Sequence, residues 1–263
     1  MQNVCISEKS TLRAEQAPVS TVYRTAHLLE LIYMQIAGLV PFSTTDWPGQ
    51  ISAVVFLQGC PWRCLYCHNP HLQPFSREVA LDAPPSLSWT DVASLLEKRR
   101  GLLDAVVFSG GEPTMQPNLH RCVQEIQEMG FLVGLHTAGT NLSALAKVVS
   151  LVDWVALDIK ALPDDYDGIT SSRESSTAAF QCLSLIEGSA KSYEVRTTVH
   201  PEFLSEQQQL QLVELLASAG VRNYALQAYR TTGSALKLPV VPLSARVVSR
   251  CEELFESFSR REL

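Results

Sequence analysis

Short apolar runs rich in β-branched residues recur along the chain from Ile51 onward, and longer stretches of mixed polarity separate them. Near-continuous apolar runs of this length are typical of strands that are covered on both faces, as in parallel sheets. The pattern therefore predicts six strands, at Ser52–Leu57, Ala105–Phe108, Phe131–Leu135, Trp154–Leu157, Tyr193–Val199 and Tyr224–Leu226.

Capping signals predict helices between most of these strands. A serine followed three residues later by an acidic or amide side chain can cap a helix start, as Ser88 with Asp91 and Ser205 with Gln208 would do. Glycine commonly ends a helix, and proline is favoured at its first position. Further boundaries are expected at Gly101, Pro117, Gly130 and Gly220, and a last helix is expected over Ser244 to Phe258.

Strands that alternate with helices predict an α/β fold with a parallel sheet. Right-handed crossovers allow either an open doubly wound sheet or a curved, barrel-like one. Six units are too few for a complete eightfold barrel. The choice between a flat and a curved sheet therefore depends on the chemistry at the strand ends.

The rest of the sequence indicates the domain bounds of the protein and the kinds of surface that it is not expected to bind. Residues 1–33 are polar at first and lack a strand-like run, so we interpret them as an N-terminal extension of a domain over 34–263. Prolines and serines over 74–88 predict a surface loop. No run reaches the roughly 18 uncharged apolar residues of a membrane helix, and a signal peptide is not recognisable. A net charge of −6 argues against general binding to nucleic acid or anionic membranes.

Three of the seven cysteines, Cys60, Cys64 and Cys67, fall within eight residues. A chain of this size does not need disulfides, so we expect a reducing, cytoplasmic setting in which the cluster is a metal site. Soft thiolates suit iron–sulfur clusters and zinc. A zinc site needs a fourth ligand, and the adjacent His68 is poorly placed to provide it. On a four-iron cluster, three cysteines leave one iron open for a substrate or cofactor.

Polar residues follow the end of every predicted strand. Active sites of α/β sheets and barrels form at the carboxyl ends of strands, and a plain core does not require such clustering. After the first four strands come Gln58–Asn69, Ser109–Pro113, His136–Gly139 and Asp158–Lys160. The fifth strand carries Arg196, Thr198 and His200, and the sixth carries Gln227, Tyr229 and Arg230.

The spacing C-x-x-x-C-x-x-C, with the aromatic Tyr66 just before the last cysteine, resembles that of radical S-adenosylmethionine (SAM) enzymes. The segment Arg63–Pro70 is similar to that of glycyl-radical-enzyme activating enzymes. The approach through Leu39–Ser43, Asp46–Gly49 and Val54–Cys60 resembles the branch that activates anaerobic ribonucleoside-triphosphate reductase. The resemblance extends from about Met34 to about Arg230, and it favours a partial (β/α)6 TIM-like barrel with a curved parallel sheet.

The resemblance implies roles for individual residues. The three clustered cysteines would ligate a [4Fe–4S] cluster, and the amino and carboxylate groups of SAM would chelate its fourth iron. Gly110-Gly111-Glu112 matches the motif that receives the methionine amino group. Glycines allow close backbone approach, and a carboxylate complements an ammonium group. The other cofactor-binding candidates are Tyr66 near the adenine, Asp158 and Lys160 in an Asp-x-Lys match, Arg196 near the cofactor carboxylate, and Thr137.

The resemblance also implies a reaction and partners. The reduced cluster would cleave SAM to methionine and a 5′-deoxyadenosyl radical, which would remove hydrogen from a glycine of a partner enzyme. The expected partner is anaerobic ribonucleoside-triphosphate reductase, and the expected electron donor is flavodoxin- or ferredoxin-like. The protein itself would orient the reactants and exclude water, while the cofactor carries the chemistry.

One stretch departs from the family pattern. Related activating enzymes usually carry Asp-Thr/Ser-Asn-Gly after the third strand, whereas this chain has His136-Thr137-Ala138-Gly139. Either His136 substitutes for that aspartate or the local structure differs. Two other interpretations of the whole chain stay open here: a radical SAM enzyme that acts on a small molecule or RNA, and a zinc-binding interaction module.

Overall fold

The computed structural model describes residues 34–75 and 87–262. The predicted extension over 1–33 and most of the predicted loop over 74–88 lie outside these residues. Within the described part, no helix has the length and apolar character needed to cross a membrane.

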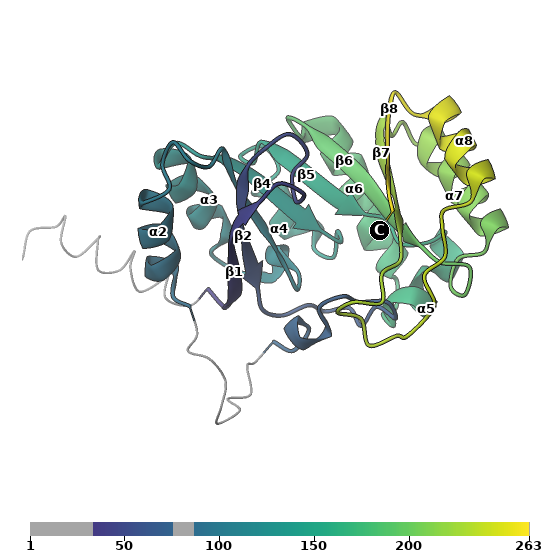
Figure 1. The fold of residues 1–263 in the computed structure, drawn as a ribbon, viewed down its shortest axis with the longest axis horizontal. Helices are drawn as coiled ribbons and strands as arrows, with labels where there is room; N and C mark the ends of the chain where they lie inside the picture. The colour runs from purple at the N-terminus through teal and green to yellow at the C-terminus, as the bar shows by residue number, and fades with distance from the viewer. Residues whose placement is uncertain (1–33, 76–86, 263) are drawn as a thin grey trace, which may run out of the picture.

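Eight strands form one sheet in which the spatial order is the sequence order (Figure 1). The first strand pairs antiparallel with the second, and every later pair is parallel. The predicted α/β fold with a curved parallel sheet is confirmed. The strands are β1 (Ile36–Ser43), β2 (Ser52–Leu57), β3 (Ala105–Gly110), β4 (Leu132–Thr137), β5 (Trp154–Asp158), β6 (Tyr193–Val199), β7 (Asn223–Ala228) and β8 (Ser257–Arg261).

Helices follow the strands and cover the outer face of the sheet (Figure 1). Both predicted capping boxes are present, at Ser88 and at Ser205. Gly101, Gly130 and Gly220 have positive φ just after three of the helices, as expected for residues that end a helix. The helices are η1 (Pro70–Leu72), α2 (Trp89–Glu97), η2 (Pro113–Met115), α3 (Leu119–Glu128), α4 (Leu142–Ala146), η3 (Pro163–Asp165), α5 (Tyr166–Thr170), α6 (Ser175–Ser189), α7 (Glu206–Ser218) and α8 (Ala245–Leu254).

Two predicted helix boundaries are wrong. Helix α3 begins at Leu119, so Pro117 precedes it instead of opening it. The preceding Gln116 explains the delay, because its side chain bonds to the backbone of residues 35 and 58 and holds this segment in a loop. Helix α8 ends at Leu254 instead of continuing to Phe258. Phe255 packs against Tyr224 with ring centroids 4.6 Å apart, and the chain then extends into β8.

The two faces of the sheet have different environments. Alternate residues such as Val55, Phe108 and Leu157 face the helices and are fully buried in the main core. Complete burial of side chains of this size contributes about 1.5–3 kcal/mol each. The opposite, inner face has its own small apolar cluster, to which Val107 and Ala156 belong.

The loop after β1 covers the inner face near the amino ends of the strands. Trp47 stacks on Trp154 of β5 with ring centroids 5.3 Å apart. Gly134 of β4 makes room for this stack, since a Cβ atom there would lie 2.9 Å from the Trp47 ring. The polar residues of the inner face are therefore concentrated toward the carboxyl ends of the strands.

Candidate active site

The three clustered cysteines lie in one loop that leaves the carboxyl end of β2. Hydrogen bonds from the Gly59 and Cys60 amides to the carbonyls of Leu72 and Gln73, of 2.8 and 3.0 Å, fix the start of the loop. Further along, the Leu65 amide donates to the Ile169 carbonyl over 3.0 Å. Cys60, Cys64 and Cys67 are free thiols and are partly exposed. The loop therefore presents all three sulfur atoms at the rim of the sheet without a disulfide.

Electrostatics indicate that these thiols share one environment. Burial raises the pKa of Cys60 to about 12, and the negative charges of Glu112 and Cys64 add to this. Burial also raises the pKa of Cys64, which Lys160 opposes and Cys67 reinforces. Thiols in such a site ionise when a cationic metal group binds them. No three His, Cys, Asp or Glu side chains in the described residues are gathered around a single metal ion position. Three free, soft thiols within one loop are nevertheless a donor set that suits an iron–sulfur cluster.

Two glycines at the end of β3 allow that strand to contact the cysteine loop. A Cβ atom on Gly110, which has φ +114°, would lie 2.3 Å from the Leu57 nitrogen, and one on Gly111 would lie 2.4 Å from the Gly59 oxygen. Instead, the Gly111 and Glu112 amides donate to the carbonyls of Leu57 and Gly59, each over 2.8 Å. The close backbone contact therefore requires glycine at both positions, whether or not a ligand is bound.

Glu112 follows this pair and has no exposed surface. One carboxylate oxygen accepts from the Thr114 amide, the Thr114 hydroxyl and the Thr137 hydroxyl, at 3.1, 2.6 and 2.7 Å. Among the described residues, the other oxygen accepts only from the Ala138 amide, at 2.8 Å. Burial raises the pKa of Glu112, whereas these hydrogen bonds lower it. The second oxygen retains the capacity to accept from a ligand such as an ammonium group.

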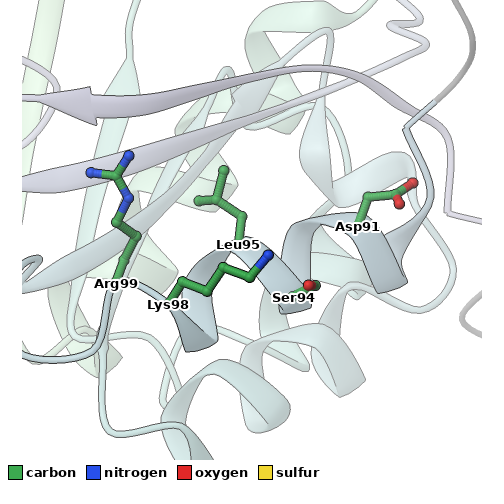
Figure 2. A pocket seen from close by; sticks show the side chains of 5 residues that line it. All are labelled: Asp91, Ser94, Leu95, Lys98 and Arg99. Carbon is green, nitrogen blue, oxygen red and sulfur yellow. The ribbon is translucent and has the colours of Figure 1, made fainter.

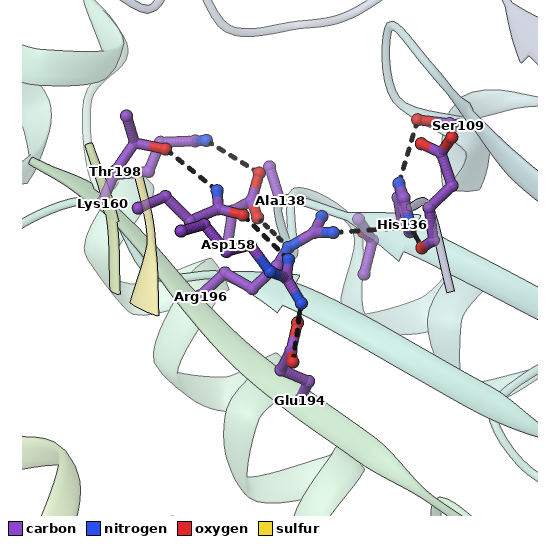
Figure 3. A network of polar contacts seen from close by, with 12 residues as sticks. Ser109, His136, Ala138, Asp158, Lys160, Glu194, Arg196 and Thr198 are labelled. Carbon is purple, nitrogen blue, oxygen red and sulfur yellow. Dashed lines mark hydrogen bonds and ion pairs between the residues drawn. The ribbon is translucent and has the colours of Figure 1, made fainter. Parts of the chain in front are cut away.

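The Asp-x-Lys pair and Arg196 form one charged group at the ends of β5 and β6 (Figure 3). Arg196 Nε lies 2.9 Å from Asp158 Oδ1, and Lys160 Nζ lies 3.6 Å from Asp158 Oδ2. Burial opposes ionisation of Asp158, but the charges of Arg196 and Lys160 hold its pKa at about 2. Lys160 Nζ also lies 5.8 Å from the Tyr66 ring centroid. This geometry places Tyr66, Lys160 and Asp158 together beside the cysteine loop.

His136 lies on the inner face between this charged group and the end of β3 (Figure 3). Its Nε2 is 2.8 Å from the Asp46 carbonyl oxygen, and its Nδ1 is 3.2 Å from the Ser109 hydroxyl. A carbonyl oxygen only accepts, so Nε2 carries the proton and the Ser109 hydroxyl donates to Nδ1. Both ring nitrogens of His136 are therefore engaged by the protein itself.

The other polar residues noted at the strand ends have contacts within the protein. His68 Nε2 bonds to the Arg230 carbonyl at 2.9 Å, and the His68 ring stacks on Tyr229. His200 Nε2 bonds to the Pro239 carbonyl at 3.0 Å. The first two contacts join the cysteine loop to the segment that follows β7, and the third joins the end of β6 to the same segment.

Sequence reasoning missed two charged residues of the inner face. Glu194 and Arg261 form an ion pair across β6 and β8, with a closest distance of 2.6 Å. Glu194 could have been found, because it lies two residues before Arg196 and strand side chains alternate between faces. Arg261 had no such signal, because the strand that carries it was not predicted.

A surface pocket of about 250 Å³ lies on helix α2 and shares no residue with the site described above (Figure 2). Its lining is Asp91, Ser94, Leu95, Lys98 and Arg99. Asp91 is already used in the cap of α2. This pocket is therefore not part of the candidate active site.

Comparison with known proteins agrees with the chemistry of the cysteine loop. The profile of the Radical SAM superfamily matches residues 54–225, which include most of β2, the cysteine loop and β3 to β6. A Methanocaldococcus jannaschii protein named as a glycyl-radical enzyme activating enzyme is 31% identical over 179 residues, which cover 65% of this chain and 71% of that protein. The chain belongs to the radical SAM superfamily, among the glycyl-radical-enzyme activating enzymes.

Further comparisons agree with this membership. The pyruvate formate-lyase-activating enzyme of Clostridium pasteurianum is 33% identical over 136 residues, covering 51% of this chain and 56% of that enzyme. The structure of Streptococcus suis SuiB bound to the precursor peptide SuiA matches with a TM-score of 0.60 at 12% identity, covering 98% of this chain and 57% of that one. The SuiB likeness shows the fold alone.

Membership of the radical SAM superfamily bears on one of the two alternatives left open by the sequence. It favours an enzyme over a zinc-binding interaction module. Radical SAM enzymes use a [4Fe–4S] cluster and SAM, and the free thiols of the cysteine loop fit the first of these cofactors.

Proposed function

We propose that this radical SAM activating enzyme installs a glycyl radical on anaerobic ribonucleoside-triphosphate reductase. The choice of partner is supported by the resemblance of Leu39–Ser43, Asp46–Gly49 and Val54–Cys60 to the branch that activates this reductase. These segments form β1, the loop that carries Trp47, and β2, which leads directly into the cysteine loop. A flavodoxin- or ferredoxin-like protein would supply the electron.

Each site residue has a role in this proposal. The three cysteines would ligate a [4Fe–4S] cluster, and one iron would be left without a protein ligand for SAM to bind. Glu112 receives the methionine ammonium group on the carboxylate oxygen that has one protein donor. The backbone of Gly110 and Gly111 would approach the cofactor closely, and Tyr66 would lie beside its adenine. Thr137 would act indirectly, by its hydrogen bond to Glu112. The charged group of Asp158, Lys160 and Arg196 would lie on the side of the SAM carboxylate.

When bound, the reduced cluster supplies the one-electron cleavage of SAM from which hydrogen abstraction at a glycine follows. The chain contributes binding, orientation and exclusion of water. Arg196 is fixed by Asp158, so its guanidinium is already oriented before a carboxylate arrives. The Tyr66 ring is buried and stacks on Phe203 with ring centroids 4.5 Å apart, which fixes one flat wall of the site. Preorganised groups of this kind lower the cost of binding.

An anaerobic radical assay tests the proposed function. The reconstituted enzyme would be incubated with SAM, a reductant and purified anaerobic ribonucleoside-triphosphate reductase, and electron paramagnetic resonance would be recorded. We expect a glycyl-radical signal on the reductase that requires SAM. A parallel sample with the reductase's glycine changed to alanine should remain silent.

Pyruvate formate-lyase is the second candidate partner. The relatives named as its activating enzymes are as similar to this chain as the relative with the general name. The same assay with pyruvate formate-lyase separates the two candidates. A signal on the lyase and none on the reductase would overturn our choice of partner. A radical on neither, with SAM turned over in the presence of a small molecule or RNA, would overturn the activating function.

A further inference from the structure

The carboxyl-terminal part of the chain adds polar side chains to the inner face of the sheet. The superfamily profile ends at residue 225, whereas Gln227 of β7 and Arg261 of β8 lie beyond it. These two residues are opposite each other in the β7–β8 register. Thr198 of β6 is opposite Gln227 in the neighbouring register. The segment that matches the superfamily thus ends before Gln227 and Arg261, and the carboxyl-terminal part of the chain completes this group of side chains.

Hydrogen bonds on both sides fix the orientation of the Gln227 amide. Arg261 Nη2 lies 2.6 and 2.9 Å from the two carboxylate oxygens of Glu194, and Arg261 Nη1 donates to Gln227 Oε1 over 2.9 Å. A guanidinium only donates, so the amide oxygen of Gln227 must face it. The amide nitrogen of Gln227 then faces Thr198 and donates to its hydroxyl oxygen over 3.3 Å.

The chain of hydrogen bonds ends at the Thr198 hydroxyl. This oxygen accepts from Gln227, so its own proton must point elsewhere. Among the residues that the structure describes, the hydroxyl has no acceptor for that proton. Thr198 is only partly buried and lies two residues beyond Arg196 on the same face of β6. A hydrogen-bond donor is therefore left available next to the proposed cofactor site (Figure 3).

The charges around Thr198 indicate a neutral acceptor. Glu194 is paired with Arg261. Arg196 and Lys160 are committed to Asp158 and to the proposed SAM carboxylate, so no unpaired charge of this group is left for a second ligand at Thr198. A peptide carbonyl oxygen is neutral and accepts strongly. Glycine has no side chain, so an enzyme that acts on a glycine has only the main chain of that residue to bind.

We propose that Thr198 donates a hydrogen bond to a main-chain carbonyl of the glycine-bearing segment of the partner enzyme. Gln227 and Arg261 are positioning residues, because they act by orienting the Thr198 hydroxyl. This inference rests on the proposed function, since it takes a glycine-bearing protein segment as the substrate.

The competing interpretation is purely structural: the group would only hold β8 against the sheet. Thr198→Val separates the two, because it keeps the β-branched shape but removes the hydroxyl. The Glu194–Arg261 pair and the β7–β8 backbone bonds do not involve this hydroxyl. Arg222→Ala is the matched control. Arg222 pairs with Glu256 over 3.7 Å at the opposite ends of the same strands, and both side chains are mostly exposed.

The test measures radical formation as a function of partner concentration, using the enzyme that acquires the signal in the radical assay. For Thr198→Val we expect the apparent KM for the partner to rise about fivefold, the loss expected for one neutral hydrogen bond. SAM affinity, measured separately by equilibrium binding, should change by less than about twofold. Thr198→Ser should restore the KM, Gln227→Leu should raise it, and Arg222→Ala should leave it unchanged.

An unchanged KM in Thr198→Val and Gln227→Leu would overturn the inference while the proposed function stands. An equal loss of SAM affinity would also overturn it, because Thr198 would then serve the cofactor. If the unaltered enzyme forms no radical on either partner, the proposed function fails first, and this inference fails with it.

Discussion

At the residue scale, His136 links the loop that carries Trp47 to the sheet. The sequence resemblance led us to expect an aspartate at this position, and the protonated Nε2 of the histidine is bonded to the backbone of that loop. Arg196 Nη1 lies 3.4 Å from the same nitrogen. Burial, reinforced by the positive charge of Arg196, lowers the pKa of His136 to about 3. The imidazole is therefore neutral and links that loop to the sheet.

This lowered pKa predicts a loss of stability in mild acid. The unfolded chain binds a proton at His136 below pH of about 6.5, whereas the folded protein binds it only near pH 3. The contribution of His136 is therefore complete above pH 6.5 and is lost as pH falls toward 3. We expect the unfolding free energy of the apo protein to fall more steeply between pH 6.5 and 5 than that of His136→Gln, by up to about 1.4 kcal/mol per pH unit. Anaerobic urea titrations measure both slopes, and equal slopes would contradict the assignment.

The residues that the sequence predicted are those whose chemistry is local. Three cysteines within one loop, or a Gly-Gly-Glu run after a strand, need no knowledge of the fold. The partners of Glu112 were not predictable in this way, since Thr137 lies on the next strand. Contacts between strands depend on register, which single-sequence patterns do not specify.

At the element scale, the contact between β3 and the cysteine loop requires the absence of a side chain. A methyl group on Gly111 would lie 2.4 Å from the Gly59 oxygen and 2.8 Å from the Leu72 oxygen. Both are backbone atoms of segments that hold the loop, so neither can rotate away. The cysteine loop therefore depends on this glycine for its position relative to the sheet.

Gly111→Ala should consequently displace the loop. We expect it to lower the unfolding free energy by roughly 1–3 kcal/mol, as overpacking does in other proteins, and to reduce the iron bound per chain after reconstitution. Gly38→Ala is the control, because that Cβ atom would meet nothing within 4 Å and φ at Gly38 is not positive. Thermal unfolding and iron analysis measure the two effects. Full stability and iron content in Gly111→Ala would show that the loop adapts.

The same scale shows which elements could be predicted. Strands β2 and β6 occur with the predicted bounds because both are rich in β-branched and aromatic residues and lie inside the sheet. The two edge strands were missed. Strand β1 contains a glycine and a proline and has few buried residues, and β8 is a short, polar SFSRR segment. Edge strands face water on one side and lack a strong apolar signal.

At the scale of the whole molecule, the curved sheet separates structural thiols from reactive ones. Cys122, Cys182 and Cys251 are fully buried in the core between the sheet and its helices. Buried thiols in apolar surroundings are inert. The cysteine loop, in contrast, has three partly exposed thiols, and the charge of Lys160 acts on one of them, Cys64. Among the described residues, partly exposed thiols therefore occur only at one rim of the sheet.

Removing one cysteine from each population tests this separation. In Cys64→Ala we expect reconstituted iron and sulfide to fall by at least about tenfold and SAM cleavage to be lost, because a cluster with two protein ligands lacks its third corner. The fold should persist, since Cys64 is not part of the buried core and the loop is held by backbone bonds. Cys251→Ala should show the reverse: somewhat lower thermal stability, because it deletes a buried sulfur from helix α8, and normal iron content. Iron and sulfide analysis with circular dichroism distinguishes the two patterns. A Cys64→Ala protein that retains a full cluster would require a ligand other than the three thiols of this loop.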